Sequence, residues 1–154
     1  MAAATPFYRR CDMKACLSFG DVVEVGQPRI AELARVGDLY PDGGSAEACA
    51  AFAHQVGLVE GTVVQTYGIA ATLARRADDL GEVAEIWKAM SQFCQRALVV
   101  LSRLKGKYPH CGTAQLHDAV LDYKLAADKR QRGAMEEMAC QTSEFPKGLL
   151  PELS

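Results

Sequence analysis

The chain has few of the sequence features that commit a protein to a membrane, a secretory route or a compartment. It contains no run of roughly 18 or more apolar residues, so the sequence predicts no membrane-spanning helix and no membrane partner. The first residues, MAAATPFYRRC, lack a basic stretch followed by an apolar one, so we expect no signal peptide. These absences predict a cytoplasmic protein.

Motifs for cofactor and nucleophile chemistry are missing as well. The chain contains no GxxxxGK[ST] or GxGxxG loop, the glycine-rich sequences whose backbone amides bind phosphates. It has no GxSxG turn, which would hold a nucleophilic serine beside a base. The sequence therefore predicts no cofactor, and it favours a protein without catalytic activity.

The cysteines give no metal-binding pattern. There are six, they are scattered, and no CxxC pair occurs among them. The residue types that zinc prefers come closest together in Cys11 and Cys16 and in His110, Cys111 and His117, but the spacing offers no second matched pair of ligands. In a cytoplasmic protein we expect reduced thiols that pack as small hydrophobic side chains, and we expect no metal.

One stretch, from Asp79 to Gly106, has an unbroken helical pattern. Its apolar residues recur at alternating intervals of three and four, at Leu80, Val83, Trp87, Met90, Cys94, Ala97, Leu101 and Leu104. A second row widens this stripe, at Ile86, Phe93, Leu98 and Val100. Asp79 with Glu82 three residues later is a capping-box pattern, and Gly106 followed by Pro109 ends the helix. So wide an apolar face belongs in a bundle core.

Three further main helices are expected, over Ala46 to Val56, Leu58 to Ala77 and Ala114 to about Cys140. Gly57 is expected to separate the first of these helices from the second. Gly61 and Gly68 lie seven apart on one side of the second helix, where they indicate either close approach of another helix or mere tolerance of glycine.

The two ends of the chain have weaker patterns. One or two short helices are expected before residue 40, from Pro6 to Ser18 and from Gln27-Pro28 to a stop at Gly37. The valine-rich Asp21 to Val25 is predicted to be an extended connection. Residues 141–154 contain Pro146, Gly148 and Pro151, and are predicted to form an extended or flexible tail.

These elements predict an all-α fold, a bundle of about four main helices in a single domain over residues 1–154. Only seven residues, Gly106 to Gly112, join the long helices at Leu80–Lys105 and Ala114–Cys140, so we expect these two to form an antiparallel hairpin at the centre. The wide apolar stripes leave a second arrangement open, in which a homodimer completes the core.

The near-neutral formal charge of -2 conceals two segments of opposite sign. Gly20 to Glu60 holds seven acidic and two basic residues, whereas the stretch from Arg96 to Arg132 holds eight basic and three acidic ones. Besides Arg96, the basic residues are Arg103, Lys105, Lys107, Lys124, Lys129, Arg130 and Arg132. Such residues could neutralise the phosphates of a nucleic acid or another polyanion. An ordinary solvated surface or contact with an acidic protein would use them equally well.

The spacing of Arg103 and His110 resembles that in small all-helical ribonuclease domains of the HEPN type, which carry an arginine, four to six residues and a histidine. The resemblance implies His110 as general base and Arg103 as stabiliser of the developing phosphorane charge. This chain departs from the pattern, because Gly106 and Pro109 separate the two residues and Leu104 replaces a polar residue.

Three functional hypotheses follow. The first is a small helical interaction or assembly module, associating with a protein partner or with itself. The second is a nucleic-acid or polyanion binder that uses the basic stretch, and the third is a small ribonuclease built around Arg103 and His110. The sequence favours the first, because no site motif is present and the helical surface is ample.

Overall fold

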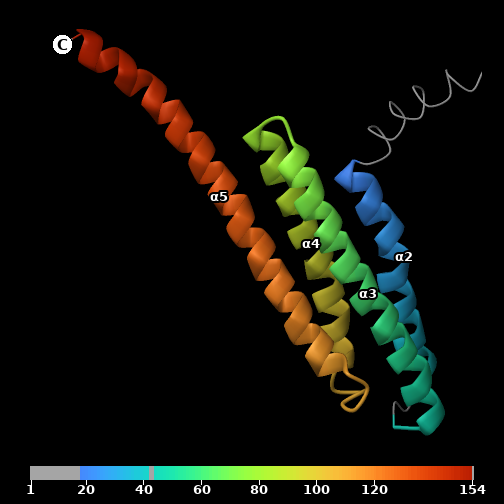
Figure 1. The fold of residues 1–154 in the computed structure, drawn as a ribbon. Coiled ribbons are helices and arrows are strands. Elements are labelled where there is room, and N and C mark those ends of the chain that lie inside the picture. Colours follow the sequence, from blue (N-terminus) through green and yellow to red (C-terminus); the bar gives the residue numbers. More distant parts are fainter. Residues whose placement is uncertain (1–17, 42–43, 154) are drawn as a thin grey trace, which may run out of the picture.

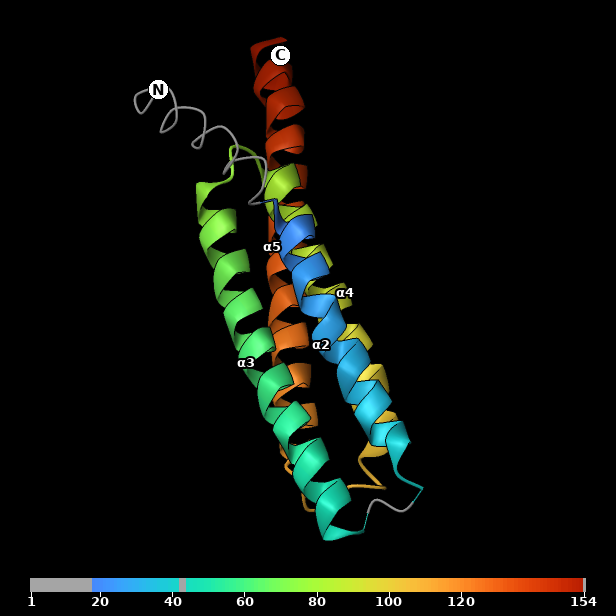
Figure 2. The same cartoon turned by 90° about the vertical axis from the view of Figure 1, so that its right-hand side faces the viewer.

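The computed structural model describes residues 18–41 and 44–153, with side chains through residue 142. Within these residues the chain forms four α-helices and no strand: α2 (Phe19–Leu39), α3 (Ala46–Arg76), α4 (Leu80–Leu104) and α5 (Thr113–Leu153). Consecutive helices run antiparallel and pack side by side (Figures 1 and 2). The predicted all-α bundle is confirmed. None of the described helices is both long and apolar enough to span a bilayer.

The helices pack because each carries the same three-and-four spacing of small or apolar residues toward the core. In α2 the buried positions on this line are Phe19, Val23, Gly26, Ile30, Leu33 and Gly37. In α3 they are Phe52, Val56, Val59, Val63, Thr66 and Ala70. A line spaced in this way stays on one side of a helix over many turns, so neighbouring helices can pack along their whole shared length.

The N-terminal half of α2 differs from the prediction. Asp21–Val25 is not extended but belongs to the helix, which begins after Ser18, whose hydroxyl accepts a hydrogen bond from the Asp21 amide at 3.3 Å. Pro28 lies inside the helix rather than at its start, and Gly37 is buried two residues before its end. Burial of the apolar line outweighs the local preferences of a valine-rich segment and an interior proline. The short helix predicted from Pro6 lies outside the described residues.

The break predicted at Gly57 is also absent, because α3 runs without interruption from Ala46 to Arg76. Glycine costs about 1 kcal/mol in a helix interior, which is less than a single buried valine contributes. A side-chain carbon added at Gly61 or Gly68 would meet nothing within 4 Å, so neither glycine allows a close helix approach. Of the two readings left open by the sequence, tolerance of glycine is the correct one.

Close approach occurs instead between α2 and α4. A Cβ atom at Gly26 would lie only 2.8 Å from Cζ of Phe93, and one at Gly37 would overlap the side chain of Leu104. Both glycines are buried on the core-facing line of α2. They let α2 lie directly against the large apolar side chains of α4.

The prediction for α4 is confirmed nearly to the residue. Asp79 is its N-cap, and the carboxylate accepts a hydrogen bond from the Glu82 amide at 2.8 Å. Six of the eight residues predicted on its seam are buried: Trp87, Met90, Cys94, Ala97, Leu101 and Leu104. Leu80 and Val83 at its N-terminal end are half-buried. The helix packs against all three other helices.

The predicted α4–α5 hairpin is also confirmed, and its packing is the most extensive in the molecule. The loop between these helices is held by Tyr108, whose ring stacks on Phe52 of α3 at a centroid distance of 3.9 Å. Thr113 donates a hydrogen bond to the Tyr108 carbonyl at 3.0 Å, and Gly112 supplies the positive φ of 76° that the turn requires.

The C-terminal end of the chain corrects another prediction. α5 does not end near Cys140 but continues as a helix through Leu153, so residues 141–153 are helical rather than extended, the first of the two alternatives (extended or flexible) predicted for residues 141–154. Its C-terminal part projects beyond the ends of the other three helices (Figures 1 and 2).

Candidate interaction surface

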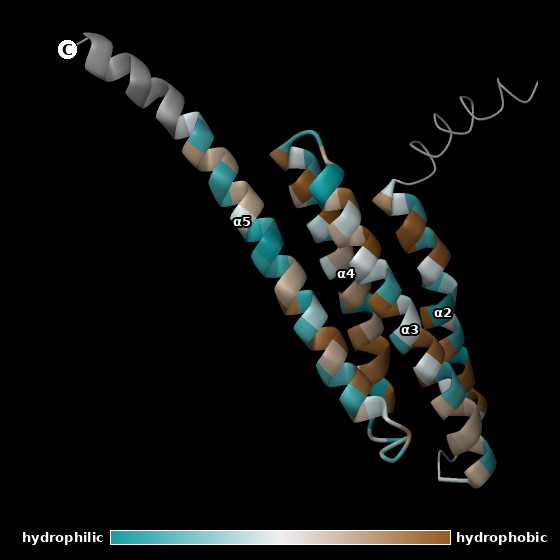
Figure 3. Cartoon of the chain, in the orientation of Figure 1, coloured by the Kyte–Doolittle hydropathy of each residue, from teal (hydrophilic) through white to brown (hydrophobic). Residues whose placement is uncertain are grey.

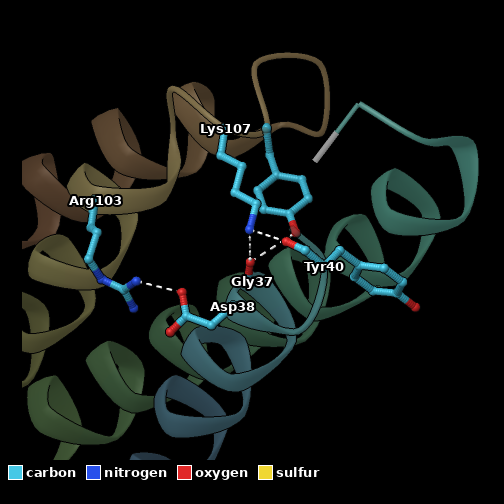
Figure 4. Close-up of polar contacts among 6 residues, drawn as sticks. Gly37, Asp38, Tyr40, Arg103 and Lys107 are labelled. Atoms are coloured by element: carbon cyan, nitrogen blue, oxygen red, sulfur yellow. Dashed lines mark hydrogen bonds and ion pairs between the residues drawn. The ribbon is translucent and has the colours of Figure 1, made fainter. Parts of the chain in front are cut away.

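The basic residues at the end of α4 bind the end of α2. The Arg103 guanidinium forms an ion pair with Asp38 at 2.6 Å, and Lys107 Nζ donates hydrogen bonds to the carbonyls of Gly37, at 2.9 Å, and Tyr40 (Figure 4). The hydroxyl of Tyr108 donates to the same Gly37 carbonyl at 3.0 Å. The last carbonyls of a helix lack partners within it and carry partial negative charge, so a lysine is well suited to cap them.

This contact pairs a residue of the basic stretch with a residue of the acidic stretch of the same chain. The hydrogen bond from Arg103 lowers the pKa of the Asp38 carboxyl below its usual value. Farther along the same two helices, the side-chain amide of Gln27, with its oxygen turned toward Arg96, accepts a hydrogen bond from Nε at 3.3 Å. Basic groups of α4 thus face α2 within the same molecule, and Arg103 and Lys107 are already bound to protein groups.

Two basic residues of α5 are likewise engaged. Lys124 Nζ contacts Asp128 at 2.9 Å, and Ser91 of α4 donates a hydrogen bond to the same carboxylate at 2.5 Å. Partial burial acts to raise the pKa of Asp128, but the hydrogen bonds and the Lys124 charge outweigh it and hold this pKa below its usual value. Arg130 lies 5.1 Å from the Trp87 ring centre and donates to the Tyr67 hydroxyl at 3.2 Å.

The predicted basic residues therefore do not form one patch. Arg130 lies against Trp87 near the start of α4, whereas Arg103 lies 16 residues farther along, about 24 Å at the rise of a helix. The side chains of Lys105, Lys129 and Arg132 are exposed.

The two residues of the ribonuclease hypothesis lie on different elements. Arg103 is in the last turn of α4 and points to Asp38 of α2, as Figure 4 shows, and His110 is exposed in the following loop. No group of three or more histidine, cysteine or acidic residues within residues 18–41 and 44–142 is placed to hold a metal ion.

The α4–α5 pair has a well-defined register. Ser91 bonds to Asp128, and Ser102 Oγ lies 3.0 Å from Nε2 of His117. These two contacts lie eleven residues, or about three turns, apart on each helix, so the two helices keep the same register along this length. This register brings Leu98 of α4 level with Leu121 of α5. A shallow groove lined by Gln95, Leu98, Val99, Ser102, Arg103 and His117 runs along the outside of the pair.

The outer side of α5 carries a second line with three-and-four spacing. Its members are Leu121, Leu125, Asp128, Arg132, Met135 and Ala139. Three of them are large apolar residues with exposed fractions of 37%, 55% and 51%, namely Leu121, Leu125 and Met135. The described residues include only seven exposed large hydrophobic side chains, so this concentration on one face of one helix is notable. Figure 3 shows hydrophobic bands alternating with hydrophilic ones along α5.

We call this line the outer seam of α5. It faces away from α3, because the side of α5 toward α3 is occupied by Tyr123, whose ring lies 4.9 Å from that of Tyr67. The expectations drawn from the sequence do not include this line, because they give this helix only by its range, Ala114 to about Cys140. The alternating spacing of the outer seam was visible in the sequence and would have revealed it.

Comparison of the chain with protein-family models, with curated proteins and with solved structures gave no match in any of the three.

Proposed function

We propose that this protein is a small, non-catalytic, cytoplasmic interaction and assembly module that binds a partner helix along the outer seam of α5. The observation that carries the proposal is the exposure of Leu121, Leu125 and Met135 on one line of a helix that projects past its bundle. Fully burying a leucine or methionine side chain gains about 1.5–3 kcal/mol, so covering this line would supply much of the free energy of a stable contact.

The spacing of the seam indicates the shape of the partner. Residues at alternating intervals of three and four form a straight strip that another helix can follow side by side. The core-facing lines of α2, α3 and α4 use the same spacing and are covered by their neighbours. The outer seam has the same pattern, but its large apolar residues Leu121, Leu125 and Met135 stay exposed.

The contacts of the basic residues support an interaction module over the polyanion alternative. Four of the seven residues that the sequence suggested for polyanion binding are bound to groups of the same chain: Arg103, Lys107, Lys124 and Arg130. A phosphate would have to compete with these contacts.

The test compares two double variants of the full chain in cells of its source organism. Leu125→Glu with Met135→Glu places two charges on the outer seam, and Val25→Glu with Val64→Glu places two charges at exposed valines of α2 and α3. Both should keep the helix content and thermal stability of the wild type. Tagged protein would be purified from the cells and the mass of its complex measured under native conditions.

We expect the wild type and the Val25/Val64 variant to be recovered in the same complex, and the Leu125/Met135 variant to be recovered alone. A complex that is unchanged by the Leu125/Met135 substitutions would refute the outer seam as the binding surface. Loss of the complex in both folded variants would refute it as well, because it would show no dependence on this face.

A further inference from the structure

We infer that the partner of the outer seam is a second copy of this chain, with the two α5 helices packed antiparallel about a twofold axis near Arg130. This inference rests on the function proposed above and names the partner for that surface. It is drawn from the order of residues along the seam. When this order is reversed and set against itself, apolar residues face apolar residues and the acidic residue faces the basic one.

Apolar residues meet apolar residues in this arrangement. An axis at residue 130 places Leu125 of one copy opposite Met135 of the other, and Leu121 opposite Ala139. Leu125 and Met135 are the two most exposed apolar side chains of the seam, at 55% and 51%. Because the axis is twofold, each contact is made twice, so four exposed large side chains are covered in the central part of the interface.

The charges on the seam also complement each other in this orientation. The two positions between Leu125 and Met135 are Asp128 and Arg132, and an axis at residue 130 sets the aspartate of each copy opposite the arginine of the other. Asp128 is held by Ser91 and Lys124, yet a quarter of its side chain, 26%, is exposed, and Arg132 is exposed. Both carboxylate oxygens of Asp128 are bound within the chain, but part of the side chain stays accessible to a second copy.

A parallel pair would not have these properties. It would place Asp128 against Asp128 and Arg132 against Arg132, so that like charges meet at the centre of the contact. In coiled coils such charge patterns decide between parallel and antiparallel pairing. The seam from Leu121 to Ala139 is about 27 Å long at the rise of a helix, which gives the two copies five turns over which to pair.

The experiment uses purified full-length protein and two single variants, Leu125→Glu and Met135→Lys. In the antiparallel pair the new glutamate of one variant lies opposite the new lysine of the other, while the remaining Leu125–Met135 contact stays intact. Each variant paired with itself buries two unpartnered charges. Native mass spectrometry distinguishes the three dimers by mass, and sedimentation velocity over a concentration series measures the affinity.

We expect wild-type dimers, a self-association at least about tenfold weaker for each variant alone, and mixed dimers as the main species when the two variants are combined. The matched control is Val64→Glu mixed with Met135→Lys, which should not give preferential mixed dimers. Equal weakening of the mixture and of the separate variants would overturn the antiparallel arrangement.

Wild-type protein that stays monomeric at every concentration would overturn the second copy as partner. The proposed function would survive that result if the complex isolated from cells still depends on Leu125 and Met135. It would fail together with the inference if that complex is insensitive to both residues.

Discussion

The ring of Phe93 on α4 occupies the space that any side chain at Gly26 on α2 would need. A Cβ atom at position 26 would lie 2.8 Å from Cζ and 3.1 Å from Cε1 of this ring, and 3.2 Å from the methyl group of Thr62. Phe93 has no exposed surface, so the ring cannot move aside without disturbing the core.

Gly26→Ala should therefore lower the free energy of unfolding by about 1–3 kcal/mol, as overpacking in a close-packed core does. Gly61→Ala is the matched control, because the added carbon meets nothing within 4 Å and should raise stability by about 1 kcal/mol. Urea unfolding followed by circular dichroism measures both. Equal effects of the two substitutions would mean that α2 and α4 are not in contact at Gly26.

Replacing Trp87 with alanine tests the core around α4. The side chain is 2% exposed and packs against Tyr67, with a ring-centre distance of 5.2 Å. We expect Trp87→Ala to cost about 3–5 kcal/mol. A loss below roughly 1 kcal/mol would be incompatible with a buried indole ring at this position.

Lys107 and Lys105 form a matched pair of lysines at the end of α4. Lys107 caps two carbonyls of α2, whereas Lys105 is exposed and makes no side-chain contact among those the structure describes. Lys107→Ala should cost about 1–2 kcal/mol, because it leaves the end of α2 without its charged donor, and Lys105→Ala should change stability by less than about 0.5 kcal/mol. Thermal and urea unfolding would give both values.

Equal, small effects on stability from the two lysine substitutions would contradict the capping role of Lys107. A retardation of duplex DNA or RNA in gels that both substitutions weaken, and that disappears at high salt, would instead favour the polyanion hypothesis. Shortening of RNA that depends on His110 would favour the ribonuclease hypothesis.

Cys94 should make the protein less stable at alkaline pH. Burial raises the pKa of this thiol to about 12, whereas a thiol in the unfolded chain titrates near about 8.5. Between these values the unfolded state releases a proton that the folded state keeps, so the contribution is complete below about pH 8.5 and is lost as pH rises, at up to about 1.4 kcal/mol per pH unit.

The measurement for this prediction is the free energy of unfolding of the wild type and of Cys94→Ala from pH 7 to pH 10. The substitution lowers stability at neutral pH through lost packing, so the slopes are compared rather than the absolute values. We expect a shallower decline above about pH 8.5 in the variant. Parallel curves would show that the Cys94 thiol titrates normally in the folded protein.

The sequence was sufficient to predict α4 and its pairing with α5. Asp79 and Glu82 mark the start of α4, and the seam through Trp87 and Leu101 is regular enough that no other structure could bury it. The short connection to α5 then leaves an antiparallel hairpin as the simplest arrangement.

The errors in α2 and α3 have one physical cause. The local signals at Pro28 and Gly57 favour helix boundaries, but the apolar line continues across both residues, and tertiary burial decides when the two conflict. The close approaches at Gly26 and Gly37 could not be predicted from the sequence, because they depend on which side chains of α4 lie opposite.

For the candidate site, the sequence identified the residue types but not their partners. A basic residue that caps a helix and a basic residue that binds a ligand cannot be distinguished by residue type. Only the fold shows that Lys107 reaches the end of α2 and that Arg130 lies on Trp87.

The most extensively packed pair of helices, α4 and α5, is also joined by a short loop, and this relationship governs how the chain reaches its native state. Bringing two neighbouring helices together closes a small loop and costs little chain entropy, so this hairpin can form before the rest of the molecule. The α2–α3 pair is also joined by a short connection, of six residues, so it can form independently and then dock through Gly26 and Gly37. A chain with such local contacts is expected to fold in microseconds to milliseconds, with the final docking of the two hairpins as its slow step.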